Sequence, residues 1–282
     1  MSGATSRARR DALLAEMTAR EVPGSAAFIF GGAGAGIIAK AAIAAGLDAV
    51  MTYNIAKFRM DGNASLLGYL PYGDANAITL ELAPRIIPAA GGRPVIAGVG
   101  AADPYREMGA LLDRVIDAGF SGVVNTPTAG IYEGAFREEI ERAGIGYGRE
   151  VDMVKMCRDR EIFSLVYAFG EEDAATMAAA GADAISPHLG TTGAFADLDA
   201  AMEDAVQRTN AMAEAARAVN PQVKIVAHGG PLETPDAVRR VLALSAATSY
   251  IAGSSLERIP VTAAVGEATR SFSALPVGGR NE

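Results

Sequence analysis

Short apolar segments recur along the chain, and longer stretches with the apolar and polar spacing of a helix separate them. Eight segments of five to seven residues are apolar almost throughout and do not alternate with polar positions. Strands that are buried on both faces have this pattern, which is typical of parallel sheets. We therefore predict eight strands, at residues 26–30, 49–54, 95–100, 122–127, 163–169, 184–190, 224–230 and 249–255.

Glycines mark the ends of three of the predicted helices. In "AAIAAGLDAV", "VIDAGFSGVV" and "MAAAGADAIS" a helical stretch runs into a glycine and then into an apolar segment. Glycine is favoured just past a helix end, because the backbone there often takes a left-handed conformation that crowds a side chain. We predict this conformation at Gly46, Gly119 and Gly181.

A helical stretch follows each of the eight predicted strands. Eight strand-helix units fit a (β/α)8 barrel better than a doubly wound sheet, which usually has about five to seven strands. The predicted architecture is α/β, a single TIM barrel over residues 23–272. An additional N-terminal helix within residues 1–22 either closes the bottom of the barrel or packs on a partner subunit, and residues 273–282 form a tail.

The composition of the chain limits the kinds of ligand that it is expected to bind and indicates its cellular compartment. The formal net charge of -8 argues against a nucleic-acid or anionic-membrane partner, although a local site for a small anionic metabolite is compatible with it. No apolar run reaches the roughly 20 residues of a membrane helix. The single cysteine, Cys157, cannot form an internal disulfide, and its helical context predicts a buried apolar role. These features predict a cytoplasmic protein, and its Ala- and Val-rich terminal helices predict a homo-oligomer.

The chemistry of a TIM barrel takes place where the strands end, because the strand-to-helix loops meet at that face. Both histidines of the chain, His188 and His228, fall there. They are predicted to move protons near neutral pH, with the alternative that each only bonds to a loop. Asn54 and Asn125 end two other strands and are predicted to orient a carbonyl or enolate oxygen.

Glycine- and serine-rich loops follow several strands at the same face. Amides of Gly229 and Gly230 after the seventh strand, with Gly253, Ser254 and Ser255 after the eighth, predict a site for a phospho or carboxylate group. The competing interpretation is that Gly229 and Gly230 only form the turn after the seventh strand.

The glycines after the first strand raise the question of a nucleotide. Gly31 and Gly32 are predicted to allow close approach of a substrate or a tight turn. The glycine spacing in "GGAGAG" does not match the dinucleotide fingerprint, so we expect no nucleotide cofactor.

Carboxylates at the loop face are candidates for Mg²⁺, which prefers oxygen ligands. Asp103 and Glu133 are the predicted metal ligands, and Glu133 is also a candidate acid or base. Capping of the next helix is the competing interpretation for Asp103, because Pro104 follows it.

The connection over residues 54–76 is unusually long, which favours either a lid over an anionic substrate or an oligomer contact. An aldolase that uses Lys57 or Lys40 as a Schiff-base amine is a further hypothesis.

Four motifs together carry a resemblance to a known family: "NTPTAGIYEGAFREEIERAGIGYGREVDM", "PHLGTTG", "AHGGPLETPDAV" and "AGSSLERIPV". Over nearly its whole length the chain resembles the phosphoenolpyruvate hydrolase-like family of TIM-barrel proteins. "AAAGADAISP" also resembles the sixth-strand segment of the phosphoenolpyruvate mutase and isocitrate lyase superfamily, which handles 2-oxo acids with Mg²⁺. The acidic D-x-D pair and the Lys-Cys-Gly loop of that superfamily are absent from the sequence.

The resemblance implies an enzyme that acts on a small phospho- or phosphono-2-oxo acid by hydrolysis or lyase-type cleavage. Its matching motif positions are His188, His228, Gly229, Gly230, Ser254 and Ser255. Members often occur fused or adjacent to an ATP-binding domain related to a plant antiviral resistance protein. The resemblance therefore also implies the alternative of a non-catalytic ligand sensor that works with an ATP-binding partner protein.

Overall fold

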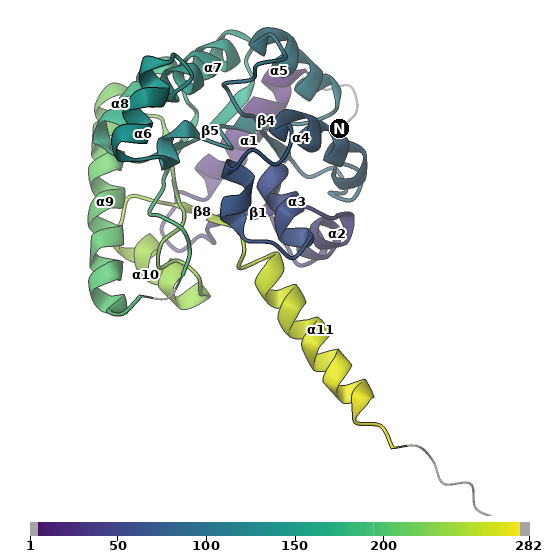
Figure 1. Ribbon diagram of the computed structural model, residues 1–282. Helices are drawn as coiled ribbons and strands as arrows, with labels where there is room; N and C mark the ends of the chain where they lie inside the picture. Colours follow the sequence, from purple (N-terminus) through teal and green to yellow (C-terminus); the bar gives the residue numbers. More distant parts are fainter. Residues whose placement is uncertain (1–4, 194, 277–282) are drawn as a thin grey trace, which may run out of the picture.

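The eight strands form one closed parallel barrel in which each strand pairs with its neighbours in the sequence and β8 pairs with β1. The computed structural model describes residues 5–193 and 195–276 (Figure 1). This architecture confirms the predicted (β/α)8 TIM barrel. The strands are β1 (Phe28–Gly32), β2 (Ala49–Thr52), β3 (Val95–Gly98), β4 (Gly122–Val124), β5 (Phe163–Ala168), β6 (Ala184–Pro187), β7 (Lys224–Ala227) and β8 (Ser249–Ala252).

The strand starts follow the sequence pattern closely. Seven of the eight strands begin at the predicted residue, whereas β1 begins at Phe28, two residues later than predicted. Those seven end one to three residues earlier than predicted, because the apolar segments continue into the loops that bear the candidate site residues.

The helices surround the barrel and occupy the connections between strands. Gly46, Gly119 and Gly181 have φ values of +100°, +103° and +101°, which confirms the predicted left-handed helix ends. The helices are α1 (Ser6–Ala19), α2 (Gly36–Ala44), α3 (Asn54–Met60), α4 (Ala75–Ile86), α5 (Met108–Asp117), α6 (Gly134–Arg142), α7 (Tyr147–Asp159), α8 (Glu171–Ala180), α9 (Leu198–Val219), α10 (Pro235–Leu244) and α11 (Arg258–Ser273), with 3-10 turns η1 (Ser65–Tyr69) and η2 (Ala129–Ile131).

Alternate residues of each strand point to opposite faces, so the barrel has an inner and an outer core. Phe28, Phe30, Met51, Ile96 and Leu165 belong to the inner core, which fills the barrel. Two outer clusters lie between the strands and the surrounding helices. Cys157 on α7 is fully buried in one of them, as predicted.

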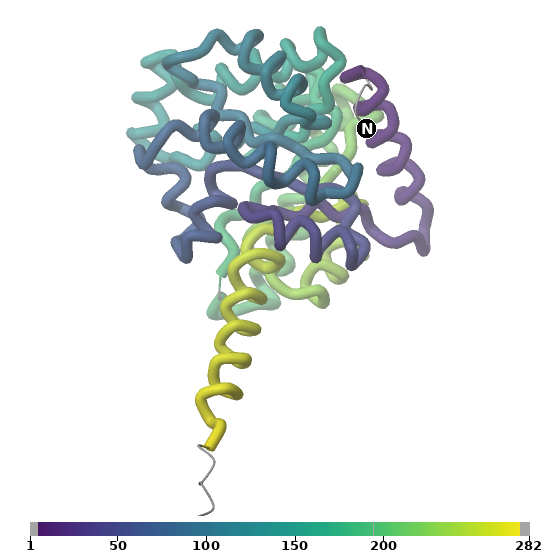
Figure 2. The backbone as a smooth tube through the Cα atoms, turned by 90° about the vertical axis from the view of Figure 1, so that its right-hand side faces the viewer, coloured from purple at the N-terminus to yellow at the C-terminus, as the bar shows by residue number. Residues whose placement is uncertain are grey.

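Helix α1 lies across the amino ends of the strands and closes the barrel bottom (Figure 2). Its Leu13 and Met17 are buried in the inner core. Arg10 forms an ion pair of 2.7 Å with Asp183, the residue that precedes β6. Of the two roles predicted for this helix, the structure assigns closure of the barrel.

Helix α11 differs from the other helices because it points away from the barrel (Figure 1). None of its residues is buried. It belongs to the stretch 23–272 that the sequence assigned to the barrel, and the predicted tail, 273–282, lies outside the described residues from 277 onward. Among the residues that the structure describes, no helix combines the length and the hydropathy needed to cross a membrane.

Candidate functional site

Inward-facing residues at the carboxyl ends of the strands surround a cavity of about 230 Å³. Each stands two or four positions beyond an inner-core residue of its strand, which places it on the inward-facing side at the barrel mouth. These lining residues are Tyr53, Thr126, Tyr167, His188, His228 and Gly253, from strands β2, β4, β5, β6, β7 and β8.

The two histidines meet inside this cavity. Their ring centroids are 5.4 Å apart in an edge-to-face arrangement, and the ring of Tyr167 lies 5.3 Å from His188 and 5.1 Å from His228. A backbone bridge between His188 and His228 extends the pairing of β6 with β7. The structure thus brings together the two residues that the sequence placed on this face.

Backbone contacts fix opposite tautomers for the two rings. Nδ1 of His228 lies 3.0 Å from the carbonyl oxygen of Ile251, which can only accept, so this nitrogen carries the proton and Nε2 keeps its lone pair. Nδ1 of His188 accepts the Gly190 N–H at 3.2 Å, so a neutral His188 carries its proton on Nε2. One histidine therefore offers a ligand an acceptor and the other a donor.

Burial keeps both rings neutral at physiological pH. Loss of hydration lowers the pKa of His188 to about 3, with a further contribution from the neighbouring His228. The pKa of His228 is lowered to about 4, mainly by burial and despite its bond to Ile251. The pair can accept a proton at one ring and donate a hydrogen bond at the other without prior ionisation.

Three tyrosines complete the cavity wall beside the histidines. Burial raises the pKa of Tyr53 and of Tyr167 and raises that of Tyr69 to about 12. All three phenols therefore remain protonated near neutral pH. They are able to donate hydrogen bonds to a bound oxygen.

Arg59 on α3 supplies a positive charge at the cavity wall. Its Nη1 forms a buried ion pair of 2.6 Å with Glu257 and lies 3.2 Å from the Tyr53 hydroxyl, while its Nε donates to Ser65 at 2.9 Å. Within the described residues its Nη2 has no acceptor, so this group is available to a ligand.

The turn after β8 forms the adjacent part of the wall. Ser254 lines the cavity, and its hydroxyl lies 3.2 Å from that of Ser65. Arg258 also lines the cavity, and its buried Nε lacks a partner among the described residues. The carboxylate of Glu257 accepts from the Gly34 N–H at 3.0 Å, which ties this turn to the loop after β1. Two arginines and two serines thus make this side of the cavity suited to an anion.

The glycines after His228 have a different role from the predicted anion contacts. Gly229 and Gly230 do not line the cavity, and the N–H of Gly230 donates to the carbonyl oxygen of Gly190 at 2.9 Å. Both have positive φ, and a Cβ on Gly229 would lie 2.4 Å from the Gly190 oxygen. They hold the loops after β6 and β7 together around the histidines.

Both asparagines point away from the cavity. Asn125 is fully buried and binds the Glu150 carboxylate together with the backbone N–H and carbonyl of Tyr167. Asn54 donates to the Gly68 carbonyl at 2.7 Å and holds η1 in place. Their neighbours Thr126 and Tyr53 are the residues that reach the cavity, because adjacent positions face opposite sides of the barrel wall.

Three other predicted binding residues lie outside the cavity. A Cβ on Gly31 would lie 2.4 Å from the Leu256 side chain, and one on Gly32 would lie 2.6 Å from the Glu257 carboxylate, so both provide space for the turn after β8. Ser255 lines a separate groove on the outside of the barrel, next to Tyr250.

The predicted metal ligands do not form a metal site. All lone-pair directions of Asp103 are engaged: it accepts from the N–H groups of Tyr105 and Arg106, from Asn76 and from the Arg106 side chain. Helix capping, the competing interpretation, is also wrong: the side chain of Glu107 caps α5, whereas Asp103 holds the turn before it. Glu133 is exposed and precedes α6 outside the cavity.

The donor set of the cavity does not fit Mg²⁺ either. Among the residues that the structure describes, its lining includes two arginines but no carboxylate. Among the described residues no group of three or more His, Cys, Asp or Glu side chains could hold a metal ion.

The two lysines considered for a Schiff base are also away from the cavity. Lys57 is paired with Asp61 at 2.7 Å on the surface, and Lys40 is exposed on α2. The segment 54–76 that contains Lys57 folds into α3 and η1, and its Arg59, Ser65 and Tyr69 line the cavity.

Sequence reasoning missed Glu257 and Tyr167 as site residues, whereas it had considered Arg59 as part of a lid over an anionic substrate. Strand alternation could have found Tyr167, since Leu165 and Phe163, two and four residues earlier, face the barrel interior. Arg59 and Glu257 are separated by 198 positions, and no local pattern reports their pairing.

Comparison with known proteins places the chain among long relatives. The tomato (Solanum lycopersicum) ToMV susceptible protein tm-1(GCR26) is 39% identical over 248 residues, which are 86% of this chain and 33% of the relative. The tomato ToMV resistance protein Tm-1(GCR237) is 38% identical over the same share. The chain spans about a third of the length of these curated relatives.

Solved structures share the fold at low sequence identity. Phosphoenolpyruvate phosphomutase from Streptomyces platensis subsp. rosaceus is 15% identical with a TM-score of 0.60, over 96% of this chain and 86% of that one. A phosphonopyruvate hydrolase in complex with oxalate and Mg²⁺ is 16% identical with a TM-score of 0.59, over 94% and 86%. These likenesses confirm the barrel.

The family comparison covers nearly the whole described barrel. The model of the family described as phosphoenolpyruvate hydrolase-like matches residues 13–275, from the helix that closes the barrel bottom to the end of α11. The matched range includes both histidines, Arg59 and the turn after β8. The chain therefore belongs to the phosphoenolpyruvate hydrolase-like family.

Proposed function

We propose that this protein is an enzyme that cleaves a small anionic 2-oxo acid by hydrolysis or a lyase reaction, with His228 and His188 as the proton-handling pair. The observation that carries the proposal is the pair of neutral rings in one cavity, one with a free acceptor and one with a free donor. A cavity of about 230 Å³ suits a metabolite of few atoms. The fold-sharing phosphonopyruvate hydrolase supports this substrate class.

The roles of the side chains follow from their contacts. Nε2 of His228 removes a proton from water or from a substrate hydroxyl, and its bond to Ile251 stabilises the resulting imidazolium. The Nε2 proton of His188 and the phenols of Tyr53 and Tyr167 donate to the substrate oxygen on which negative charge develops. Nη2 of Arg59 and the Ser254 hydroxyl bind the carboxylate or phospho group.

In this proposal arginine side chains supply the positive charge that a divalent cation would otherwise supply to the substrate. Mg²⁺ is present in the fold-sharing hydrolase complex, but this cavity lacks carboxylates and has Arg59 and Arg258 in its wall. The proposed reaction is therefore carried by the side chains alone, and chelators should leave it unaffected. The proposed compartment is the cytoplasm, which suits a chain whose one cysteine is free and buried.

Pyruvate release from phosphoenolpyruvate, phosphonopyruvate and a panel of acylpyruvates tests the proposal, in the presence of EDTA or Mg²⁺. We expect turnover with EDTA and a loss of about 100- to 10,000-fold in kcat for His228→Ala, the usual contribution of a general base. Glu133→Gln is the matched control outside the cavity and should keep wild-type activity. Turnover that needs Mg²⁺, or that survives in a folded His228→Ala protein, would refute the assignment.

The second candidate function is a ligand sensor that works with an ATP-binding partner. The observation that favours it is length: the curated relatives are about three times as long as the matched segment, which leaves room for further domains. A sensor would bind members of the same panel, seen by calorimetry, without turnover by the wild-type protein. Binding without turnover would thus favour the sensor over the enzyme.

A further inference from the structure

The backbone of Tyr167 extends beyond the strand that lies beside it. The pairing of β4 with β5 ends where Val124 meets Leu165, whereas β5 continues to Ala168. After β4 the chain turns, and the Thr126 N–H donates to the Val124 carbonyl at 2.8 Å. A buried N–H or C=O group without a partner costs free energy, so the backbone of Tyr167 needs partners other than a strand on this side.

The side chain of Asn125 supplies these partners in place of a strand. Its Oδ1 accepts the Tyr167 N–H at 2.7 Å, and its Nδ2 donates to the Tyr167 carbonyl at 3.2 Å. Only this orientation of the amide works, because a carbonyl oxygen can only accept and an N–H can only donate. The hydroxyl of Tyr147 donates a second bond to the same carbonyl at 2.6 Å. Asn125 is fully buried, so solvent does not compete for these bonds.

Glu150 on α7 holds the Asn125 amide in this orientation. Its buried carboxyl group accepts from Asn125 Nδ2 at 2.5 Å and from the Ala129 N–H at 2.6 Å, and it lies 2.7 Å from the Thr128 hydroxyl. Tyr147 and Glu150 lie one turn apart on α7, so the first turn of this helix supports both Asn125 and the Tyr167 carbonyl. The sequence motif over residues 125–153 contains all three of these supporting side chains.

The ring of Tyr167 is the part of the cavity that this network supports. It lies 5.3 Å from the ring of His188 and 5.1 Å from that of His228. We propose that Asn125 and Glu150 are positioning residues that set the Tyr167 phenol against the two histidines without touching the substrate. The kinetic consequence rests on the proposed function, because the phenol is there a donor to the substrate oxygen. The placement of the ring does not depend on that function.

Proton NMR of the histidine rings tests this placement without a substrate. The chain has two histidines, so His188→Gln and His228→Gln assign their signals. The ring current of Tyr167 shifts these signals, and Tyr167→Leu gives their positions without it. We expect Asn125→Ala and Glu150→Gln to move the histidine signals toward the positions in Tyr167→Leu. Glu150→Gln keeps the side-chain volume but cannot accept from both Asn125 and the Ala129 N–H, so it applies the same test where the alanine variant does not fold.

Asn76 is the matched control, because its amide makes the same kinds of contact at another loop. It bonds to both the N–H and the carbonyl of Gly100 and donates to the Asp103 carboxylate. Asn76 is also buried, but Gly100 is outside the set of residues that line the cavity. Asn76→Ala should lower thermal stability about as much as Asn125→Ala and leave the histidine signals in place. Histidine signals that move equally in both variants, or that keep their wild-type positions in Asn125→Ala, would overturn the proposal.

Steady-state kinetics test the consequence for the proposed reaction. Arg59 and Ser254, the proposed anion-binding groups, are bonded to other side chains than Asn125 and Glu150. We therefore expect kcat to fall about 10- to 100-fold in Asn125→Ala while KM stays within about twofold, and both values to stay unchanged in Asn76→Ala. A higher KM with wild-type kcat would show that Asn125 acts on binding and not on the Tyr167 phenol. A wild-type protein without turnover would refute the proposed function, and the histidine signals would still decide the placement of the ring.

Discussion

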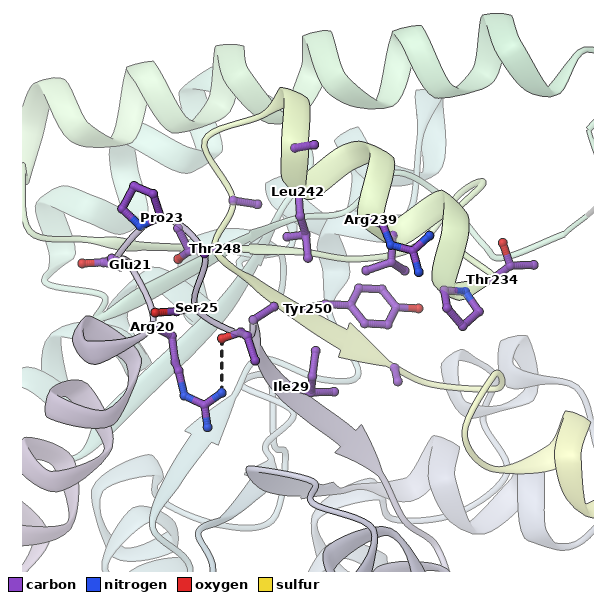
Figure 3. A pocket seen from close by; sticks show the side chains of 18 of the residues that line it. Arg20, Glu21, Pro23, Ser25, Ile29, Thr234, Arg239, Leu242, Thr248 and Tyr250 are labelled. Atoms are coloured by element: carbon purple, nitrogen blue, oxygen red, sulfur yellow. Dashed lines mark hydrogen bonds between the residues drawn. The ribbon is translucent and has the colours of Figure 1, made fainter.

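The groove on the outside of the barrel and the cavity at its mouth differ in size, chemistry and origin. The outer groove has about four times the volume of the mouth cavity, 920 against 230 Å³. The groove is lined mainly by aliphatic residues from the segment 20–29, from α10 and from β8 with its flanking turns (Figure 3). The cavity is lined by histidine, tyrosine and arginine side chains that face inward from the strand ends and from α3.

This difference indicates that the two surfaces bind different kinds of partner, a small ligand in the cavity and a protein segment in the groove. The smaller hollow has groups whose pKa values are shifted and whose hydrogen bonds fix a tautomer, which are marks of a ligand site. The larger hollow has apolar surface next to the uncovered helix α11, which is the mark of a protein contact. The volume of a hollow alone therefore does not identify the ligand site, because the larger groove lacks these features.

The largest effect on the cavity side is expected from Glu257→Ala. Removal of this carboxylate leaves the buried Arg59 guanidinium without its counter-ion, which should destabilise the fold by about 3–5 kcal/mol. Urea unfolding measures it. The double variant Arg59→Met with Glu257→Ala should recover a large part of the loss, since it leaves no buried charge. Equal losses in the single and double variants would mean that the ion pair does not stabilise this wall.

Gly229→Ala should have the next largest effect, about 2 kcal/mol or more. An alanine there takes an unfavourable left-handed conformation and also contacts the Gly190 oxygen. Gly24→Ala is the matched control, because Gly24 has a φ of +88° but no atoms near a Cβ. Thermal unfolding of both variants separates the two costs. Similar losses would show that the loop contact next to His228 is unimportant.

The titratable groups of the cavity predict that the stability of the fold depends on pH. His188 and His228 have lowered pKa values in the fold, so stability from them is complete above about pH 6.5 and is lost as the pH falls toward 4. Each contributes a slope of up to about 1.4 kcal/mol per pH unit. Urea titrations between pH 5 and 6.5 should show a smaller slope in His228→Gln.

Glu150 affects the pH dependence of folding stability in the opposite direction to the histidines. Burial raises its pKa to about 8, so its contribution is complete below its ordinary pKa near 4.3 and is lost as the pH rises toward 8. Glu150→Gln should therefore steepen the acid dependence between pH 5 and 6.5. A flatter dependence in this variant would contradict the assigned protonation of Glu150.

The smallest expected effect is on the groove side. Tyr250 donates from its hydroxyl to the Leu232 carbonyl at 2.6 Å, so Tyr250→Phe should cost about 1 kcal/mol and leave the histidine chemistry nearly unchanged. Tyr105→Phe, at an exposed site, is the control and should be neutral. Thermal unfolding together with the pyruvate assay would expose a hidden link between groove and cavity if Tyr250→Phe lowered kcat tenfold.

The sequence predicted the barrel well because its signals are local. Apolar runs located the strand starts, and Gly46, Gly119 and Gly181 located the helix ends. The position of the histidines at the strand ends followed from the same count of strands. These predictions depend only on neighbouring residues and on one rule of barrel anatomy.

The individual site residues were harder to predict because adjacent positions face opposite sides. The sequence analysis predicts Asn125 and Asn54 as site residues, but their neighbours Thr126 and Tyr53 are the ones that reach the cavity. The exit of α11 from the barrel was also unpredictable, since its apolar residues are equally compatible with packing on its own barrel. The residue before this helix, Glu257, bonds to Arg59, which is 198 positions away in the sequence.

Helix α1 has a consequence for the order in which the chain acquires its structure. Arg10 pairs with Asp183 and Arg9 donates to the Phe120 carbonyl, so this helix bonds to segments that are synthesised more than a hundred residues later. Contacts of such long range slow folding. The apolar side chains of Leu13 and Met17 therefore remain exposed to solvent until β6 has been synthesised. During this interval the nascent chain is most prone to aggregation and most dependent on chaperones.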